Sequence, residues 1–297
     1  MNRIKDQIRC GAAYRLGLTG KGIGVAVLDT GIFLHRDFDS RVTGFADMVN
    51  RKNFAYDDCG HGTHICGIIG GSGRMSGGRY SGIAPGCDLV MVKVLDRKGN
   101  GYSSDVLAGI SWILERKETL GIRILNISVG ACSKRGMTEN SALVKGVNRA
   151  WDAGLVVVVA AGNNGPRTMS ITTPGISRKV ITVGCSDDDR EVLVGGNRMV
   201  DYSGRGPTAA CICKPDLVAP GCSVVSCAGR ADKYTIKSGT SMSTPIVSGA
   251  TALLLERYPD MTNKDVKLKL RESCTDIGLP RNQQGWGLLD VEKLVSK

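Results

Sequence analysis

Short apolar runs recur along the first two thirds of the chain, and glycine or polar residues bound each of them. Runs of Val, Ile and Leu of this length are typical of strands that are buried on both faces, as in parallel sheets. We therefore expect a parallel sheet. Its strands are predicted at residues 23–29, 88–95, 122–128, 155–161 and 179–184.

Several of the intervening segments carry the spacing of amphipathic helices. Residues 103–117 and 138–153 each place apolar side chains on one stripe, and Ser103 or Ser104 is a candidate N-cap for the first helix. Residues 241–258 are apolar on nearly all sides, which predicts a helix in the centre of the protein. Strands that alternate with helices predict a doubly wound α/β fold with its site at the carboxyl ends of the strands.

Capping and loop signals in the sequence add detail to this fold. Thr262 and Asp265 have the spacing of a capping box at the start of a further helix. The Gly/Ser-rich residues 70–82 predict a surface loop. Because no linker, repeat or low-complexity tract interrupts the pattern, we expect residues 1–297 to form a single domain.

Composition narrows the functional class. Apolar residues make up 42% of the chain, charged residues 23%, and there are 40 glycines, which suits a globular enzyme and excludes a fibrous or disordered chain. The net charge of +11 raises the question of a nucleic-acid partner. The basic residues are scattered and aromatics are only 5%, so we expect a basic solvated surface and no nucleic-acid partner. The longest apolar run, residues 155–161, is too short to span a bilayer, so no membrane association is expected.

Cysteine usage bears on the compartment. The chain has 11 cysteines, an odd number, and several, such as Cys66 and Cys185, fall in expected core elements. Residues 1–20 have no apolar signal region. We therefore expect free thiols, a cytoplasmic location and folding without a separate prosegment, with a secreted, processed form as the alternative. The oligomeric state stays open.

The first chemical motif is Asp-Thr-Gly at residues 29–31. Asp29 directly follows a predicted buried strand, so its carboxylate needs a partner, and an imidazole N–H would suit it. A turn aspartate is the plain alternative. Aspartic proteases also use Asp-Thr-Gly, but they need two such carboxylates and the chain has one.

The second motif surrounds His61. Glycines flank this histidine on both sides, which lets other backbone and a substrate approach it. His61 and His64 could instead be metal ligands together with residues 57–59, but the spacing is not that of a regular zinc motif. We expect His64 to be structural, and we expect no metal in the site.

The third and fourth motifs supply a hydroxyl and a carboxamide. Ser241 opens the predicted buried helix, where the helix N-terminus favours developing negative charge; a simple N-cap serine is the alternative. The surrounding residues 239–243 do not form G-x-S-x-G, which argues against an α/β-hydrolase esterase. Asn163 follows a predicted strand in a Gly-rich turn, and its side chain can donate to an oxyanion.

With these four motifs in register, the chain resembles the subtilisin-like serine proteases (subtilases) over about residues 8 to 294. The segments 128–130 and 214–221 are also similar to segments that recur in the family. The free cysteines make the chain closest in character to the intracellular bacterial members. The resemblance implies a subtilisin-like, doubly wound α/β fold.

The resemblance also implies a serine endopeptidase that acts on protein or peptide substrates through an acyl-enzyme. In it, Ser241 is the nucleophile, His61 the general base and then acid, Asp29 the residue that orients His61, and Asn163 the oxyanion donor. The implied substrate-binding residues flank the P1 side chain and pair with an extended peptide. They are Ser128, Val129, Gly130, Ala160, Ala161 and Gly162. A catalytically silent subtilase-fold binding or regulatory protein is the alternative.

The resemblance suggests a site for a structural calcium ion, because Asp37 matches an aspartate that holds calcium in many secreted relatives. Residues 71–77, however, offer neither a carboxylate nor an asparagine, so we expect no required metal or cofactor. Asp187, Asp188 and Asp189 are expected to form an exposed acidic turn, with a calcium site as the alternative.

Overall fold

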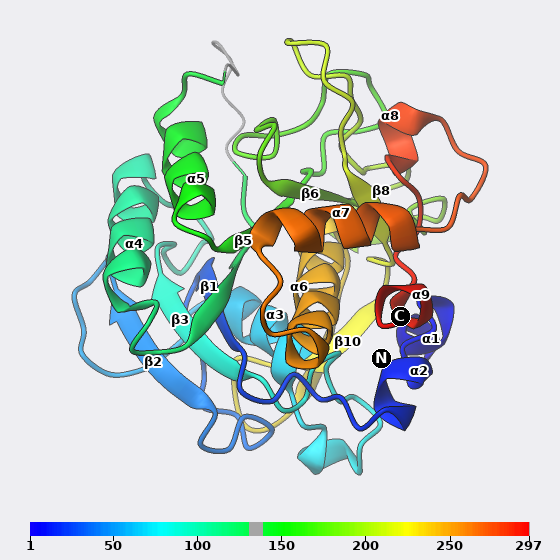
Figure 1. The fold of residues 1–297 in the computed structure, drawn as a ribbon. Coiled ribbons are helices and arrows are strands. Elements are labelled where there is room, and N and C mark those ends of the chain that lie inside the picture. The colour runs from blue at the N-terminus through cyan, green and yellow to red at the C-terminus, as the bar shows by residue number, and fades with distance from the viewer. Residues whose placement is uncertain (131–138, 297) are drawn as a thin grey trace.

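A seven-stranded sheet forms the centre of the computed structural model, which describes residues 1–130 and 139–296 (Figure 1). The strand order is β2-β3-β1-β4-β5-β6-β9, and every neighbouring pair is parallel. All five predicted strands are confirmed. The strands are β1 (Gly24–Asp29), β2 (Val42–Asp47), β3 (Asp88–Lys93), β4 (Ile122–Ile127), β5 (Val156–Ala160), β6 (Ile181–Cys185) and β9 (Leu217–Ala219).

Helices cover both faces of this sheet. Gly109 in helix α4 (Ser103–Arg116) lies against Leu28 and Val92, whereas Gly62 in helix α3 (His61–Gly70) lies against Met91. Successive residues of a strand point to opposite faces, so α4 and α3 are on opposite sides of the sheet. Helix α5 (Ala142–Asp152) packs beside α4, and helix α6 (Thr240–Arg257) packs beside α3 (Figure 1). The doubly wound arrangement is thereby confirmed.

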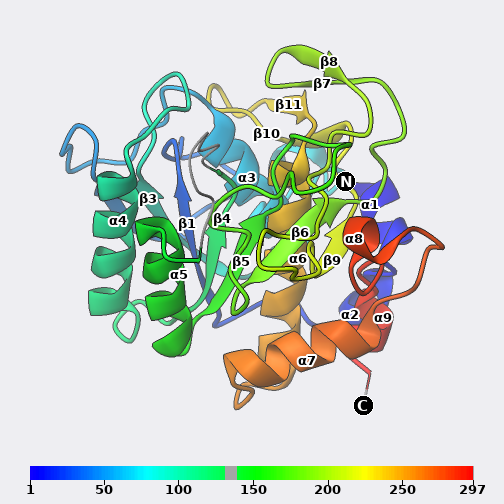
Figure 2. The ribbon, with the colours of Figure 1, turned by 90° about the horizontal axis from the view of Figure 1, so that it is seen from above.

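Smaller elements surround this layered core. The N-terminal helices lie next to the C-terminal helix α9, where the Val291 amide donates to the Ile8 carbonyl at 2.8 Å (Figure 2). Within the described residues, no helix combines the length and hydrophobicity that crossing a membrane requires. The smaller elements are α1 (Asn2–Gln7), α2 (Gly11–Arg15), the 3-10 helix η1 (Arg74–Ser76), the hairpins β7 (Val192–Val194) with β8 (Asn197–Met199) and β10 (Val224–Cys227) with β11 (Tyr234–Lys237), α7 (Asn263–Ser273), α8 (Arg281–Gln284) and α9 (Val291–Leu294).

The helix starts agree with the sequence-based predictions only in part. The capping box of Thr262 is confirmed, and α6 is buried along nearly its whole length. The cap predicted for α4 is wrong, because Tyr102 is the N-cap and makes no side-chain capping bond. Helix α5 begins after Ser141, whose hydroxyl accepts the Val144 amide; residue 138, where we expected the helix to start, lies outside the described residues.

The expected exposed turn at residues 187–189 is wrong for its first two members. Asp187 is 9% and Asp188 5% exposed. The Asp187 carboxylate accepts two successive loop amides, the first from Gly221 at 2.7 Å, and Asp188 accepts the Ser203 amide at 2.7 Å. These carboxylates are buried because they satisfy backbone donors from distant loops.

Strand order places the functional site. The chain fills one side of β1 with β3 and β2, and then turns to the other side with β4, so the order reverses next to β1. In doubly wound sheets, ligands bind outside the carboxyl ends of the strands at such a reversal. Asp29 is the last residue of β1, and Ser128 directly follows β4.

Candidate functional site

A buried carboxylate holds the histidine of the site. Asp29 is fully buried at the end of β1, and both of its carboxylate oxygens lie within reach of His61 Nδ1, at 2.8 and 2.9 Å. Because a carboxylate only accepts hydrogen bonds, Nδ1 carries the proton and Nε2 of the neutral ring is a base. The His61 side chain remains 23% exposed, so the pair combines a buried anchor with an accessible ring.

The pKa of His61 results from two opposed effects. Burial lowers this pKa, while the adjacent Asp29 charge and its hydrogen bond raise it, and the balance lies above the ordinary value for histidine. Asp29 thus favours the imidazolium form, which a base must adopt after it has taken a proton.

A second aspartate, which the sequence analysis did not single out as an organiser, fixes the start of α3. The Thr30 hydroxyl donates to Asp57 at 2.9 Å and accepts the Gly62 amide at 2.9 Å. Asp57 also accepts the Gly60 amide at 2.7 Å and both the amide and the hydroxyl of Thr63. This network ties the end of β1 to the helix that begins with His61. An acidic residue shortly before a helix start was the available signal.

The other histidine of the motif is structural, as predicted. His64 is fully buried, and its Nε2 lies 3.1 Å from the Val224 carbonyl in β10. Burial lowers the pKa of His64 to about 3, so the ring is neutral. His64 therefore contacts the strand that packs on α3 and does not share a ligand site with His61.

Ser241 is the second residue of α6 and is partly exposed. Its hydroxyl donates to the Ser128 carbonyl at 2.7 Å, at the end of β4. The structure thus brings Ser241 to the carboxyl edge of the sheet, with its hydroxyl directed to a backbone carbonyl and not to His61. A serine hydroxyl can turn about its Cα–Cβ bond, so the Ser241 hydroxyl can leave this carbonyl for another acceptor.

Asn163 lies beside the start of α6. Its Oδ1 accepts both the amide and the hydroxyl of Thr240, each at 3.0 Å. Because a backbone amide can only donate, this contact fixes the orientation of the carboxamide and leaves its NH₂ as a donor. Gly239, at φ 142°, lies against that NH₂, and a Cβ there would come within 3.3 Å of it. Sequence reasoning identified Asn163 but missed Thr240, which holds it.

The segment after β4 becomes more exposed along its length: Ser128 is buried, Val129 is half-buried and Gly130 is exposed. Val129 and Gly130 line a cavity of about 220 Å³ together with Leu143 and Tyr102. The segment therefore offers backbone groups to a ligand beside a mainly apolar hollow.

The segment after β5 is engaged internally. Ala160 ends the strand, the Ala161 amide donates to the Val183 carbonyl at 2.9 Å, and the Ala161 carbonyl accepts the Thr172 amide at 2.9 Å. Gly162 donates to the Thr240 hydroxyl at 3.2 Å and packs against Thr172. Residues 160–162 thus form a fixed wall. Thr172, which also lies against Gly130, is a further residue that sequence reasoning missed.

The surroundings of Asp37 do not fit a calcium ion. Its carboxylate accepts the Met75 amide at 2.9 Å and the Tyr234 hydroxyl at 2.7 Å, and a thiol lies close by. Calcium requires a cage of about 6–8 oxygen ligands, whereas here donors and a sulfur converge on one carboxylate.

Comparisons relate the chain to known proteins. Serine protease AprX of Bacillus subtilis (strain 168) is 42% identical over 292 residues, which cover 93% of this chain and 65% of that protein. A thermostable alkaline protease of Halalkalibacterium halodurans is 36% identical over 268 residues, covering 90% of this chain and 66% of the relative. The chain thus matches slightly less than two thirds of each of these relatives. Subtilisin BL of Lederbergia lenta is 34% identical over 287 residues, 97% of this chain and 96% of that protein.

The structural comparison agrees with the sequence comparison. The solved structure of Sphericase is similar with a TM-score of 0.79 and 31% identity, and the match covers 92% of this chain and 93% of that one. The model of the subtilase family (Peptidase_S8) matches residues 20–287. Because this match includes all seven strands of the central sheet and the four motifs described above, the chain belongs to the subtilase family.

Proposed function

We propose that this protein is a serine endopeptidase that hydrolyses peptide bonds through an acyl-enzyme on Ser241. The observation that carries the proposal is the contact between the buried Asp29 carboxylate and His61 Nδ1 at 2.8 Å, at the edge of the sheet where α6 presents Ser241. A buried carboxylate that selects the basic tautomer of a partly exposed histidine is what general-base activation of a hydroxyl requires.

The proposed reaction begins when the Ser241 hydroxyl leaves the Ser128 carbonyl. His61 Nε2 takes its proton as the oxygen attacks the scissile carbonyl carbon, and the carbonyl oxygen becomes negative. The Asn163 NH₂ and the amide of Ser241, at the N-terminus of α6, donate to this oxyanion. His61 then gives its proton to the leaving amine, and water repeats the sequence on the acyl-enzyme while Asp29 stays ionised.

Protein or peptide substrates bind in extended form in this proposal. Residues 128–130 pair with the substrate backbone, because this segment continues β4 beyond the sheet and is increasingly exposed along its length. Residues 160–162 act as the opposite wall of the P1 position, because their backbone groups are already bonded. The cavity beside Val129 accepts an apolar side chain of the substrate. Residues 1–297 act as one peptidase domain, with no cofactor in the chemistry.

Hydrolysis of casein and of a fluorogenic peptide tests the proposal. The purified chain should cleave both, and Ser241→Ala should abolish cleavage while its circular dichroism spectrum remains unchanged. Ser104→Ala, on the exposed start of α4, is the matched control and should retain activity. Equal activity of Ser241→Ala and the unaltered chain, or a folded chain that cleaves neither substrate, would rule the proposal out; the second result would favour the silent binding protein.

A further inference from the structure

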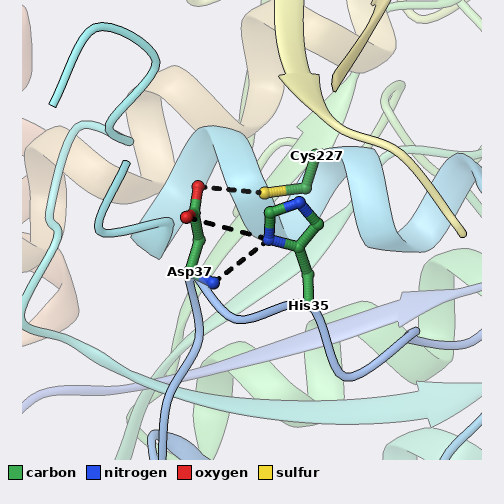
Figure 3. A group of neighbouring side chains, drawn as sticks. All are labelled: His35, Asp37 and Cys227. Carbon is green, nitrogen blue, oxygen red and sulfur yellow. Dashed lines mark hydrogen bonds and ion pairs between the residues drawn. The ribbon is translucent and has the colours of Figure 1, made fainter. Parts of the chain in front are cut away.

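Three buried side chains with different ligand chemistry, none of them part of the Asp29–His61 pair, meet beside α3 (Figure 3). His35 and Asp37 lie in the loop after β1, and Cys227 is the last residue of β10. Their exposed fractions are 1%, 0% and 0%. One ligand atom of each, a ring nitrogen, a carboxylate oxygen and a sulfur, lies within 4.8 Å of the other two.

The hydrogen bonds of His35 define its tautomer. Nε2 lies 3.2 Å from the Lys233 carbonyl, which can only accept, and Nδ1 lies 3.1 Å from the Asp37 amide, which can only donate. Nε2 therefore carries the proton, and Nδ1 presents a lone pair toward Asp37 (Figure 3). The distance of 3.8 Å between Nδ1 and the Asp37 carboxylate is consequently a contact between two acceptors.

The Asp37 charge lacks a cation in this arrangement. Throughout residues 1–130 and 139–296, no lysine or arginine side chain lies within ion-pair distance of its carboxylate, and the neutral His35 supplies no charge. The carboxylate accepts the Met75 amide and the Tyr234 hydroxyl, and the Cys227 sulfur lies 3.7 Å away. Buried charges are costly unless they are paired or coordinate a metal.

We propose that His35 Nδ1, the Asp37 carboxylate and Cys227 Sγ bind one Zn²⁺ ion. Nitrogen, oxygen and sulfur ligands together suit this borderline-soft cation. Tetrahedral bonds of about 2.0–2.3 Å separate neighbouring ligand atoms by about 3.3–3.8 Å. The two measured separations join different oxygens of the carboxylate: His35 Nδ1 lies 3.8 Å from Oδ1, and Cys227 Sγ lies 3.7 Å from Oδ2. Both distances fall at the upper end of that range, so each of the other two ligand atoms has a carboxylate oxygen facing it.

Binding of the ion breaks the S–H bond of Cys227, the hydrogen bond from that thiol to Asp37, and the hydrogen bond from the Asp37 amide to His35 Nδ1, and it keeps the other hydrogen bonds of the site. The Cys227 thiol gives its proton to solvent as the sulfur binds the ion, and the ion replaces the Asp37 amide at Nδ1. The Lys233 carbonyl on Nε2–H and the Met75 and Tyr234 donors on the carboxylate remain as the outer partners that orient zinc ligands. Water completes the fourth position.

A second thiol cluster, Cys185, Asp187 and Cys222, has similar spacing but a different charge balance. The Asp187 carboxylate pairs with Arg3 at 3.1 Å and accepts backbone amides, so its charge is already compensated. This cluster therefore lacks the uncompensated charge that points to a cation, and it supplies a matched control.

The site joins two segments that are distant in sequence. Asp37 and Cys227 are 190 positions apart, and they lie in the loop that follows Asp29 and in the hairpin that precedes Ser241. A bound ion would therefore tie together the segments that carry the proposed nucleophile and its orienting carboxylate, and should raise the thermal midpoint of unfolding. This inference stands whether or not the protein hydrolyses peptides.

Cobalt spectroscopy tests the site in the Ser241→Ala chain, which avoids self-digestion. The chain is stripped with EDTA under a phosphine reductant and titrated with Co²⁺. We expect a single equivalent to bind with a thiolate-to-cobalt charge-transfer band, Zn²⁺ to remove the band, and Zn²⁺ to raise the unfolding midpoint. Cys227→Ser should lose the band, whereas Cys222→Ser should keep it.

His35→Gln supplies an independent variant in case Cys227→Ser does not fold. It keeps every thiol but removes the ring nitrogen, and it should weaken Co²⁺ binding at least tenfold. The proposal is overturned if the folded parent chain binds no Co²⁺, if the band survives in a folded Cys227→Ser, if Cys222→Ser abolishes it, or if His35→Gln binds as tightly as the parent.

Discussion

The Ser241 hydroxyl donates to the Ser128 carbonyl at 2.7 Å, so the proposed nucleophile rests on the segment expected to bind substrate. A substrate amide that donates to the same carbonyl would compete for it and free the hydroxyl for His61. Occupation of the substrate segment and activation of the nucleophile are thereby linked through one carbonyl oxygen. Rotation about a single side-chain bond is a small change, which suits a preorganised site.

The pH profile should report the Asp29–His61 contact. A protonated His61 cannot accept the Ser241 proton, so activity falls as the pH falls through the His61 pKa. Because Asp29 raises that pKa, the acid limb of kcat/KM should lie above about 6.5, the ordinary value for histidine.

Asp29→Asn tests the same contact. Without the Asp29 charge, burial lowers the pKa of His61, so the acid limb should move to lower pH, and kcat should fall by about 10⁴, as in an unrelated serine protease with the equivalent change. Asp260→Asn, at an exposed position, is the control. An acid limb that stays in place in Asp29→Asn would contradict the account.

Asn163→Ala should lower kcat with little change in KM, because the oxyanion forms only during the reaction. Removal of the corresponding asparagine in subtilisin, a member of the same family, costs roughly 10²–10³ in kcat, and we carry that magnitude over. Asn164→Ala is the adjacent control and should stay near the unaltered rate. Steady-state kinetics measure both variants. A large loss of kcat in Asn164→Ala with none in Asn163→Ala would contradict the assignment of Asn163 as the oxyanion donor.

Sequence patterns predicted the parts of the fold that are locally encoded. Five sheet strands were predicted because continuous apolar runs suffice to recognise strands buried on both faces. β2 was missed because its residues are mostly half-exposed and include polar side chains, and β9 was missed because it is only three residues long. Both complete the sheet through pairing with distant strands.

The candidate site divides in the same way. Asp29, His61, Asn163 and Ser241 could be proposed from the sequence because each follows a strand or opens a helix within a recognisable motif, and their roles stay predictions. Thr172 and Thr240 support them through contacts that the sequence does not reveal, whereas the position of Asp57 before a helix start was a signal that the sequence did offer. Asp187 was misjudged for the same reason, since the amides that it accepts lie 34 and 35 positions away.

Lys93 should be essential for stability, although it takes no part in the proposed chemistry. Its side chain is fully buried, and its Nζ donates to the Thr30 carbonyl, the Leu95 carbonyl and Asp58 at 2.6–2.7 Å. Lys93→Met leaves two buried carbonyls without this donor and should lower the free energy of unfolding by about 2–5 kcal/mol. Urea denaturation of the Lys93→Met variant in the Ser241→Ala background measures this loss of unfolding free energy.

The exposed Lys98 provides the matched control, since Lys98→Met removes the same charge without uncovering a buried acceptor. Identical denaturation midpoints for Lys93→Met and Lys98→Met would show that the buried ammonium does not support the loop that carries Thr30.

Thiol reagents should inactivate the protein through Cys59. All ten cysteines in the described part of the chain are free, and Cys59 is exposed two positions before His61. Partial burial raises the pKa of this thiol. Because the thiolate is the reactive form, alkylation should accelerate above neutral pH. An adduct there should displace the start of α3 and lower peptide hydrolysis.

Two cysteine variants separate this effect from general modification. Cys59→Ser should resist N-ethylmaleimide, whereas Cys211→Ser, which removes another exposed thiol, should remain sensitive. Inactivation of Cys59→Ser at the unaltered rate would assign the effect to a different thiol. Dithiothreitol alone should leave the activity of the unaltered chain unchanged.

Covalent labelling with a fluorophosphonate, read by intact mass and peptide mapping, tests the central claim most directly. The account predicts a single phosphonyl adduct on the peptide that contains Ser241, and it predicts that this adduct is absent from folded Ser241→Ala and strongly reduced in His61→Ala. A folded, unaltered chain that takes up no label, or takes it up on a residue other than Ser241, would contradict it.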